Sequence, residues 1–257
     1  MTLLLKLLLA PALVAGSSWA GRRWGAPVTG VLVALPIMAG PILLITCLEQ
    51  GPEFGSRAAA AALLGLLTLA LFTVVFAWCA RFTGWVGSLA LAWTVCLAAD
   101  LGLARLTLPP IGALLLVLLA ARGALAALPT DRAGDDTGTA PPWPWWDLPG
   151  RAAATAVLVV AVTAAAGTIG PGLTGVLAPF PVATSVVAAF VLARQGADAV
   201  ARTLRGVPRG LLGFAVFCFL VAELTEPLGV ATAFVLAVTA TLGVQLVAGR
   251  VTPTADR

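Results

Sequence analysis

The sequence contains no histidine and no tyrosine. These absences remove the most common general base and metal ligand of proteins, and also the phenolic acid. No pair of a nucleophile and a base stands out among the remaining residues. Four cysteines are present, but each lies inside an apolar run and none has the C-x2-C spacing of a metal or redox site: Cys47, Cys79, Cys96 and Cys218. The sequence therefore predicts that the protein is not an enzyme, and that it holds no cofactor and no metal.

Charged residues are also scarce. They make up 10% of the 257 residues, against about a quarter in a soluble domain. Hydrophobic residues make up 60%, in runs that recur along the chain. Because about 20 apolar residues suffice for a helix to cross about 30 Å of hydrocarbon, the composition predicts a polytopic membrane protein in contact with the lipid bilayer. The arginines behind the net charge of +4 lie in short connections between apolar runs, as topology signals do, so we expect no nucleic-acid partner.

The chain resembles itself at an offset of 145 positions. Residues 3–105 then pair with 148–250 without a gap, and about a quarter of the pairs are identical, against roughly one in ten expected from composition. Each copy carries a T-G-V-L-x3-P segment, which is followed by a Q-G-x-[ED]-x3-R turn. This pattern predicts an internal repeat of one four-helix unit.

The apolar runs divide the chain into two such units with one further helix between them. Residues 1–107 form the first unit, 108–127 a linker transmembrane helix and 128–147 a flexible acidic loop. Residues 148–250 form the second unit, and 251–257 a C-terminal tail. We expect an all-α fold with about nine transmembrane helices in a 4+1+4 order. The spans expected within the units are 3–20, 28–48, 58–79 and 84–105, then 149–166, 173–193, 207–225 and 228–249.

The additional crossing between the units is expected to turn the second unit over. The second unit keeps its arginines, Arg151 among them, on the face of its own N-terminus, and this face is expected to be cytoplasmic. The first unit instead has Arg22 and Arg23 where the second has Gly167 and Thr168. The charges therefore predict an inverted repeat, with the N-terminus outside and the C-terminus in the cytoplasm.

Prolines interrupt the second helix of each unit. A proline inside a spanning helix frees backbone carbonyls, which are tolerated in lipid only where protein or a water-filled cavity satisfies them. In transporters built from inverted repeats, paired interruptions of this kind mark the binding site. A packing kink or a helix N-terminus is the alternative interpretation. The candidate pathway residues in these segments are Pro36, Gly40, Pro41, Pro181, Thr184 and Ser185.

The repeated turn supplies two further candidates, Gln50 and Gln195, which would form a polar gate. The alternative is a turn that caps the following helix, because an acidic residue interacts favourably with the positive end of a helix. That alternative predicts an ion pair within the turn, either Glu53–Arg57 or Asp198–Arg202.

Two ionisable residues lie in or near the expected spans. Asp100 stands within the fourth span, and Glu223 stands at the end of the eighth. An ionisable residue at membrane depth is a candidate for proton or ion coupling. The alternative is that these side chains reach the membrane interface, as Arg105 beside Asp100 also could.

Each half resembles the GlpM-like small bacterial inner-membrane proteins. The resemblance rests on a G-x5-P segment followed by a Gly-containing acidic and basic turn, and it covers about 100 residues per copy. It implies a fused pair in the bacterial cytoplasmic membrane, and it carries over no catalytic or ligand residue. The segments concerned are Gly30 to Pro36 with Glu49 to Arg57, and Gly175 to Pro181 with Arg194 to Arg202.

Two functions of different classes are compatible with this sequence. The first is a small transporter or permease whose pathway for an unknown small solute lies between the two repeats. The second is a non-transporting scaffold or accessory subunit that packs against a partner membrane protein. A pathway for a charged solute usually carries several charges within the membrane, and this sequence has at most two. An apolar or lipid-like solute would need fewer.

Overall fold

The computed structural model describes residues 11, 12, 14–20, 23, 32, 39–103, 105, 106, 108–129, 147–169 and 180–251. Most of these residues are helical and none of them is in a strand, which confirms the all-α class. The helices are α3 (Ala39–Gln50), α4 (Pro52–Cys79), α5 (Trp85–Leu103), α6 (Pro110–Ala127), α7 (Asp147–Ile169), α9 (Val182–Leu204), α10 (Gly206–Leu228) and α11 (Val230–Val251).

Several of the helices have the length and surface of membrane spans. Large apolar side chains such as Leu91, Leu119 and Val235 are exposed on α5, α6 and α11, which is compatible with an integral membrane protein. The count of about nine spans stays a prediction, because the segments expected at 3–20 and 28–48 lie largely outside the described residues. Within the described residues, the stretches long and apolar enough to cross a membrane are Pro52–Cys79, Trp85–Leu103, Pro110–Ala127 and Val182–Leu228, the last containing α9 and α10.

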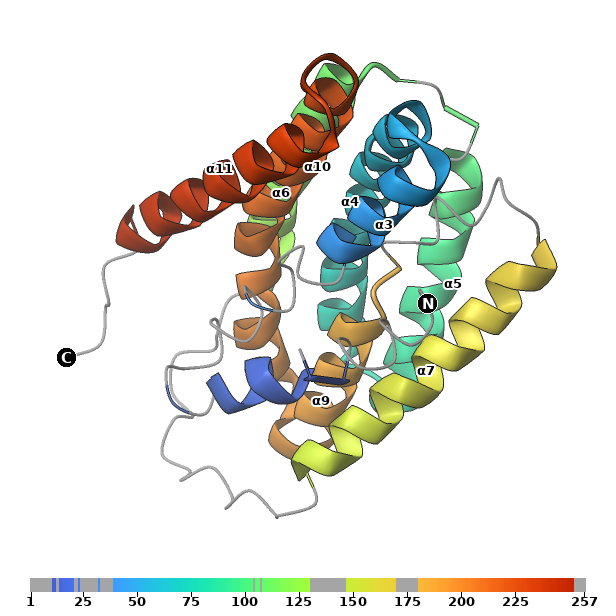
Figure 1. Cartoon of the computed structure of the whole chain (residues 1–257). Coiled ribbons are helices and arrows are strands. Elements are labelled where there is room, and N and C mark those ends of the chain that lie inside the picture. The colour runs from blue at the N-terminus through green and yellow to red at the C-terminus, as the bar shows by residue number, and fades with distance from the viewer. Residues whose placement is uncertain are drawn as a thin grey trace.

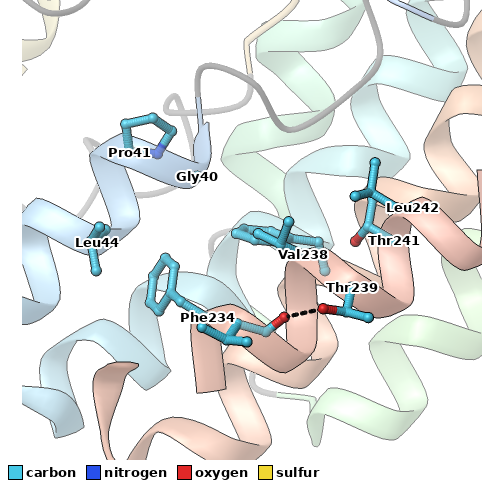
Figure 2. Close-up of a pocket in the computed structure, with 10 residues that line it drawn as sticks. Gly40, Pro41, Leu44, Phe234, Val238, Thr239, Thr241 and Leu242 are labelled. Atoms are coloured by element: carbon cyan, nitrogen blue, oxygen red, sulfur yellow. Dashed lines mark hydrogen bonds between the residues drawn. The ribbon is translucent and has the colours of Figure 1, made fainter. Parts of the chain in front are cut away.

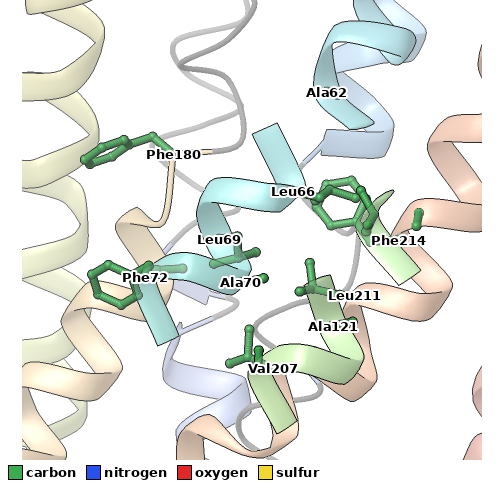
Figure 3. Packing of buried hydrophobic residues seen from close by; sticks show 14 of the residues in the cluster. Ala62, Leu66, Leu69, Ala70, Phe72, Ala121, Phe180, Val207, Leu211 and Phe214 are labelled. Atoms are coloured by element: carbon green, nitrogen blue, oxygen red, sulfur yellow. The ribbon is translucent and has the colours of Figure 1, made fainter. Parts of the chain in front are cut away.

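Helices α4 and α10 form the centre of the bundle (Figure 1). They pack against each other, and α6 packs against both. Leu66 and Phe72 of α4 and Leu211 of α10 are fully buried in the apolar core that these helices share (Figure 3). In a bilayer such packing is stabilised by van der Waals contacts rather than by removal of apolar surface from water. A close fit between side chains is therefore what holds the two central helices together.

Helices α4 and α10 run in opposite directions, as their colours in Figure 1 also show. Near the start of α4, the Ser56 hydroxyl donates to the Ala222 carbonyl near the end of α10, at 2.9 Å. At the other end, the last turn of α4 and the residue before α10 both bind the end of α6. The two hydrogen bonds there join Trp78 Nε1 to the Ala127 carbonyl at 2.8 Å and Arg205 Nη2 to the Pro129 carbonyl at 2.7 Å.

Prolines lie at the beginnings of several helices. Pro52 and Pro110 are the first residues of α4 and α6, where the missing N–H costs no helical hydrogen bond. Pro181 comes directly before α9 rather than inside a helix. The expected interruption within the second helix of the second unit is therefore wrong at Pro181, and the alternative of a helix N-terminus holds there. Pro36 lies outside the described residues.

The two glycines of the repeated turn share one unusual backbone conformation. Gly51 has φ 92° and ψ 165°, and Gly196, which lies 145 positions later, has φ 84° and ψ −177°. Only glycine occupies this region readily, because a side chain would collide with the backbone. Gly51 separates α3 from α4, and Gly196 bends the chain inside α9.

The ion pair expected within the turn is present in the first copy, where Arg57 binds Glu53. No ion pair joins Asp198 and Arg202, both of which are described. The side-chain cap is absent at α4, because the N-cap residue Gly51 has no side chain to accept a hydrogen bond from the first N–H groups of the helix. Backbone conformation at the glycine, rather than capping by a side chain, is therefore what sets this turn.

Gly196→Ala is expected to lower the free energy of unfolding by about 1–3 kcal/mol, because alanine must adopt a conformation that L-residues avoid. The matched control is Gly123→Ala, since Gly123 is exposed in the middle of α6 and has no atom near its missing Cβ. That control is expected to be neutral or slightly stabilising. Chemical unfolding in detergent micelles, followed by circular dichroism, measures the stability of both variants. If Gly196→Ala were as stable as Gly123→Ala, the backbone conformation assigned to Gly196 would be contradicted.

A buried ion pair lies at the start of α7. Arg151 Nε donates to Asp147 Oδ2 at 3.0 Å, and the side chains are 1% and 0% exposed. Arg151 also donates to the Ser18 hydroxyl at 3.3 Å, and its guanidinium lies 5.3 Å from the centre of the Phe190 ring. The sequence analysis treated Arg151 as a topology signal in a connection between spans. The structure instead gives this side chain an interior packing role, in which it joins α7 to α9.

Candidate functional site

A cavity of about 590 Å³ lies where α3 meets α10 and α11 (Figure 2). It contains two candidates from the sequence, Gly40 and Pro41, which lie in the first turn of α3. The rings of Phe217 and Phe234 meet edge to face in its wall, with 5.9 Å between their centres. The cavity is lined by Gly40, Pro41, Leu44, Phe217, Phe234, Val235, Val238, Thr239, Thr241 and Leu242.

The lining is chemically apolar. Its two hydroxyls already donate to backbone carbonyls, Thr239 to Val235 at 2.8 Å and Thr241 to Ala237 at 2.7 Å. None of the described residues that line the cavity is charged. On one side the cavity is bordered by exposed apolar residues of α11, among them Val238, which is 47% exposed. The chemistry therefore suits a hydrocarbon group that enters from the apolar surface of the bundle.

The positions offset by 145 form a second site, and there the space is filled. Trp93 of α5 corresponds to Val238 of α11, and Ser185 of α9 corresponds to Gly40 of α3. The Trp93 indole donates to the Ser185 hydroxyl at 2.8 Å and meets the Phe180 ring edge to face at 5.2 Å. The cavity thus lies where valine and glycine replace the hydrogen-bonded tryptophan and serine of the filled site.

Asp100 lies outside both sites, in α5. Its side chain is buried, with 2% exposure, and neither carboxyl oxygen has a hydrogen-bond partner. The Thr68 hydroxyl of α4 is next to this carboxyl, but it donates to the Gly65 carbonyl at 2.7 Å. One turn earlier in α5, Cys96 Sγ donates to the Thr68 carbonyl at 3.5 Å. Asp100 is therefore a buried polar group that the surrounding contacts leave unsatisfied.

The contacts between α11 and α10 reproduce those between α5 and α4 at the same offset. The Thr241 hydroxyl, whose shorter hydrogen bond is to Ala237, also lies 3.3 Å from the Gly213 carbonyl, as Cys96 Sγ lies 3.5 Å from the Thr68 carbonyl. Gln245, which corresponds to Asp100, donates its amide N–H to the Gly210 carbonyl at 3.1 Å. The Gln245 amide is therefore hydrogen-bonded at the position where the Asp100 carboxyl has no partner.

The structure separates the candidate residues rather than collecting them into one site. Gly40 and Pro41 line the cavity, whereas Thr184 and Ser185 are buried in α9, where Ser185 binds Trp93. Gln50 and Gln195 lie at the glycine turns and do not line the cavity, Pro181 is buried before α9, and Glu223 is exposed near the end of α10. A single polar pathway through all of these residues is therefore not formed by the described part of the chain.

The sequence analysis missed the residues of α11 and the tryptophan of α5. A usable signal was present, because the alignment at offset 145 pairs Trp93 with Val238 and Ser185 with Gly40. Both replacements remove volume, and a large-to-small pair at positions that touch predicts a cavity. The sequence does not indicate which helices touch, and in the structure α3 contacts α11 and α5 contacts α9.

Comparison with known proteins returns no match among family models, curated proteins or solved structures. Among the described residues, no group of three or more Cys, Asp or Glu side chains is placed to hold a metal ion.

Proposed function

We propose that this protein is a small membrane transporter for a lipid-like amphiphile, with its solute site between two inverted four-helix repeats. The observation that carries the proposal is the apolar cavity. Gly40 and Pro41 in its wall belong to the first expected repeat, and Phe217 and Val238 belong to the second. A cavity of this kind takes the hydrocarbon part of a ligand, and the absence of charge among its described lining residues fits the scarcity of charge in the spans.

Three pairs of equivalent features support the repeat. The turn glycines have the same backbone conformation, and the fourth helix of each unit donates the same hydrogen bond to the third. The contacts between units also correspond, because α3 touches α11 and α5 touches α9. Chance similarity of two apolar sequences would not place matched residues in matched contacts.

The opposite courses of α4 and α10 support inversion. These helices occupy corresponding positions in the two units, so two units of the same orientation would place them parallel. An inverted pair places both ends of a solute pathway in equivalent surroundings, which is the arrangement that alternating access exploits. Transporters of this design move one repeat against the other around a central site.

The rival proposal is a scaffold that packs against another membrane protein. It is favoured by the tightly packed contact between α4 and α10, in which apolar side chains leave no polar passage among the described residues. In a scaffold, the cavity would be a packing defect or a seat for a partner's side chain. The two functions differ in whether filling the cavity stops movement of a solute.

Val238→Trp is expected to slow lipid movement about tenfold or more, because the indole fills the site as Trp93 fills its counterpart. The measurement uses proteoliposomes that contain an NBD-labelled phospholipid. Dithionite bleaches only the label in the outer leaflet, so a protein that moves the lipid raises the bleached fraction above that of protein-free vesicles.

Leu236→Trp is the matched control. It places an indole on the same helix, at a position that is 43% exposed and does not line the cavity. This variant is expected to retain the activity of the natural protein. Bleaching by the natural protein equal to that of protein-free vesicles would reject lipid movement and leave the scaffold.

A further inference from the structure

The Asp100 carboxyl lies deep in the bundle. It is next to Thr68, near the middle of α4, which is the longest apolar helix that the structure describes. An ionised carboxylate at this depth without a partner is strongly disfavoured, whereas the protonated acid is neutral and carries a hydrogen-bond donor. The packed arrangement of α4 and α5 therefore requires the protonated form.

The equivalent contact in the other half indicates what a donor does at this position. Gln245 donates to the Gly210 carbonyl of α10, and the corresponding carbonyl of α4 is that of Gly65. Aspartate is one methylene shorter than glutamine, and the Gly65 carbonyl already accepts from Thr68. The Asp100 carboxyl thus lies where Gln245 places a hydrogen-bond donor in the other half. If it were ionised, its carboxylate oxygens would face the Gly65 carbonyl oxygen, and neither group could donate.

Among the described residues, no charged group lies against Asp100 to offset a negative charge, and Arg105, five residues further along, is exposed beyond the end of α5. Helix α5 packs against α4 and α9. The basic residues of α4 and its C-terminal turn are Arg57 and Arg81, at opposite ends, and the charged residues of α9 all follow Ala193, at the end away from the Ser185 contact. In α5 itself, the ionisable neighbour is the Cys96 thiol, which donates to Thr68.

We propose that Asp100 is a proton-binding site, which holds a proton while α4 and α5 are packed and releases it when their contact opens to water. A metal ion or other cation would need several oxygen ligands, and the described residues around the carboxyl direct their donors to backbone carbonyls instead. The use of this proton to drive transport rests on the proposed function. The binding of the proton rests on Asp100 and its surroundings alone.

The first test is labelling with dicyclohexylcarbodiimide, an apolar reagent that reacts with protonated carboxyls within membranes. The carboxyl proton moves to a carbodiimide nitrogen as the carboxyl oxygen adds to the central carbon, and rearrangement gives a stable N-acylurea with no leaving group. We expect Asp100 to be labelled in membrane vesicles, as identified by peptide mass. The rate is expected to fall about tenfold per pH unit once the pH exceeds the titration midpoint.

The second test compares stability across pH. The thermal midpoint of the natural protein in detergent is expected to fall as the pH rises and the buried carboxyl loses its proton. Asp100→Asn is expected to remove this part of the dependence, because its amide donates at every pH as Gln245 does. Glu223→Gln, at an exposed position near the end of α10, is the control and is expected to keep the natural profile.

Two results would overturn the proposal. One is a folded protein in which Asp100 stays unlabelled at every pH, and the other is the same pH profile for the natural protein and Asp100→Asn. Both experiments are carried out without a solute, so a failure to move lipid would leave their outcome unchanged. Labelling with no lipid movement would retain the proton site and reject the transporter.

Discussion

Replacement of Arg151 with alanine is expected to lower the free energy of unfolding by about 3–5 kcal/mol, whereas Arg57→Ala leaves it nearly unchanged. Each arginine pairs with an acid four residues earlier in its helix. The difference lies in burial, because both side chains of the Glu53–Arg57 pair are 72% exposed while Arg151 is 1% exposed. Removal of Arg151 leaves the Asp147 carboxylate buried without the guanidinium that donates to it, but removal of Arg57 leaves Glu53 in contact with water.

Unfolding of the two variants in mixed micelles, monitored by helical circular dichroism, measures this contrast. The double variant Asp147→Asn with Arg151→Met is expected to recover part of the loss, because it removes both buried charges and retains most of the side-chain volume. Equal stability of Arg151→Ala and Arg57→Ala would mean that the pair at the start of α7 is open to solvent.

Trp93→Ala is expected to lower the free energy of unfolding by about 2–4 kcal/mol. This lies toward the lower part of the usual range for replacing an aromatic residue with alanine, because the Trp93 side chain is half-buried. The loss has two sources. The indole leaves a void between α5 and α9, and the Ser185 hydroxyl loses the donor that it accepts from. Within a bilayer the void matters through lost van der Waals contacts, since the surrounding lipid is as apolar as the side chain.

Filling the cavity is expected to change stability in the opposite direction from Trp93→Ala. Val238→Trp with Gly40→Ser recreates the filled site at the cavity, and a Cβ at Gly40 would meet the Phe217 ring at 3.5 Å, which is ordinary contact. We expect this double variant to be as stable as the natural protein or more stable. The measurement is the thermal unfolding midpoint of both variants in the same detergent. A higher midpoint for Trp93→Ala than for the natural protein would contradict the assigned packing.

Elements that depend on local chemistry were predictable from the sequence. The helix expected at 108–127 corresponds to α6, which begins at Pro110 because a proline fits the first helical position. The Glu53–Arg57 pair follows from spacing of one helical turn. The turn at Gly51 follows from a glycine between two apolar runs. Each of these features involves residues close together in the chain.

Elements that depend on distant contacts were not predictable in the same way. Arg151 is buried because Ser18 and Phe190 surround it, and nothing in the residues next to it indicates that enclosure. The cavity exists because α3 meets α11 across the two halves, so the small side chains at Gly40 and Val238 come together. A pattern within one helix records which face is apolar, but it does not record which helix covers that face.

The hydrogen bond from Ser56 to Ala222 joins residues that are 166 positions apart, and it belongs to the central contact of the bundle. A ribosome that adds about 5–20 residues per second needs roughly 10–30 s to make the chain between them. During that interval α4 has entered the membrane without α10, so its small and aromatic side chains face lipid rather than their final partner. The central contact of the bundle can therefore form only late in synthesis, and until α10 is made, α5 and α6 are the neighbours of α4 that follow it directly in the chain and can cover it.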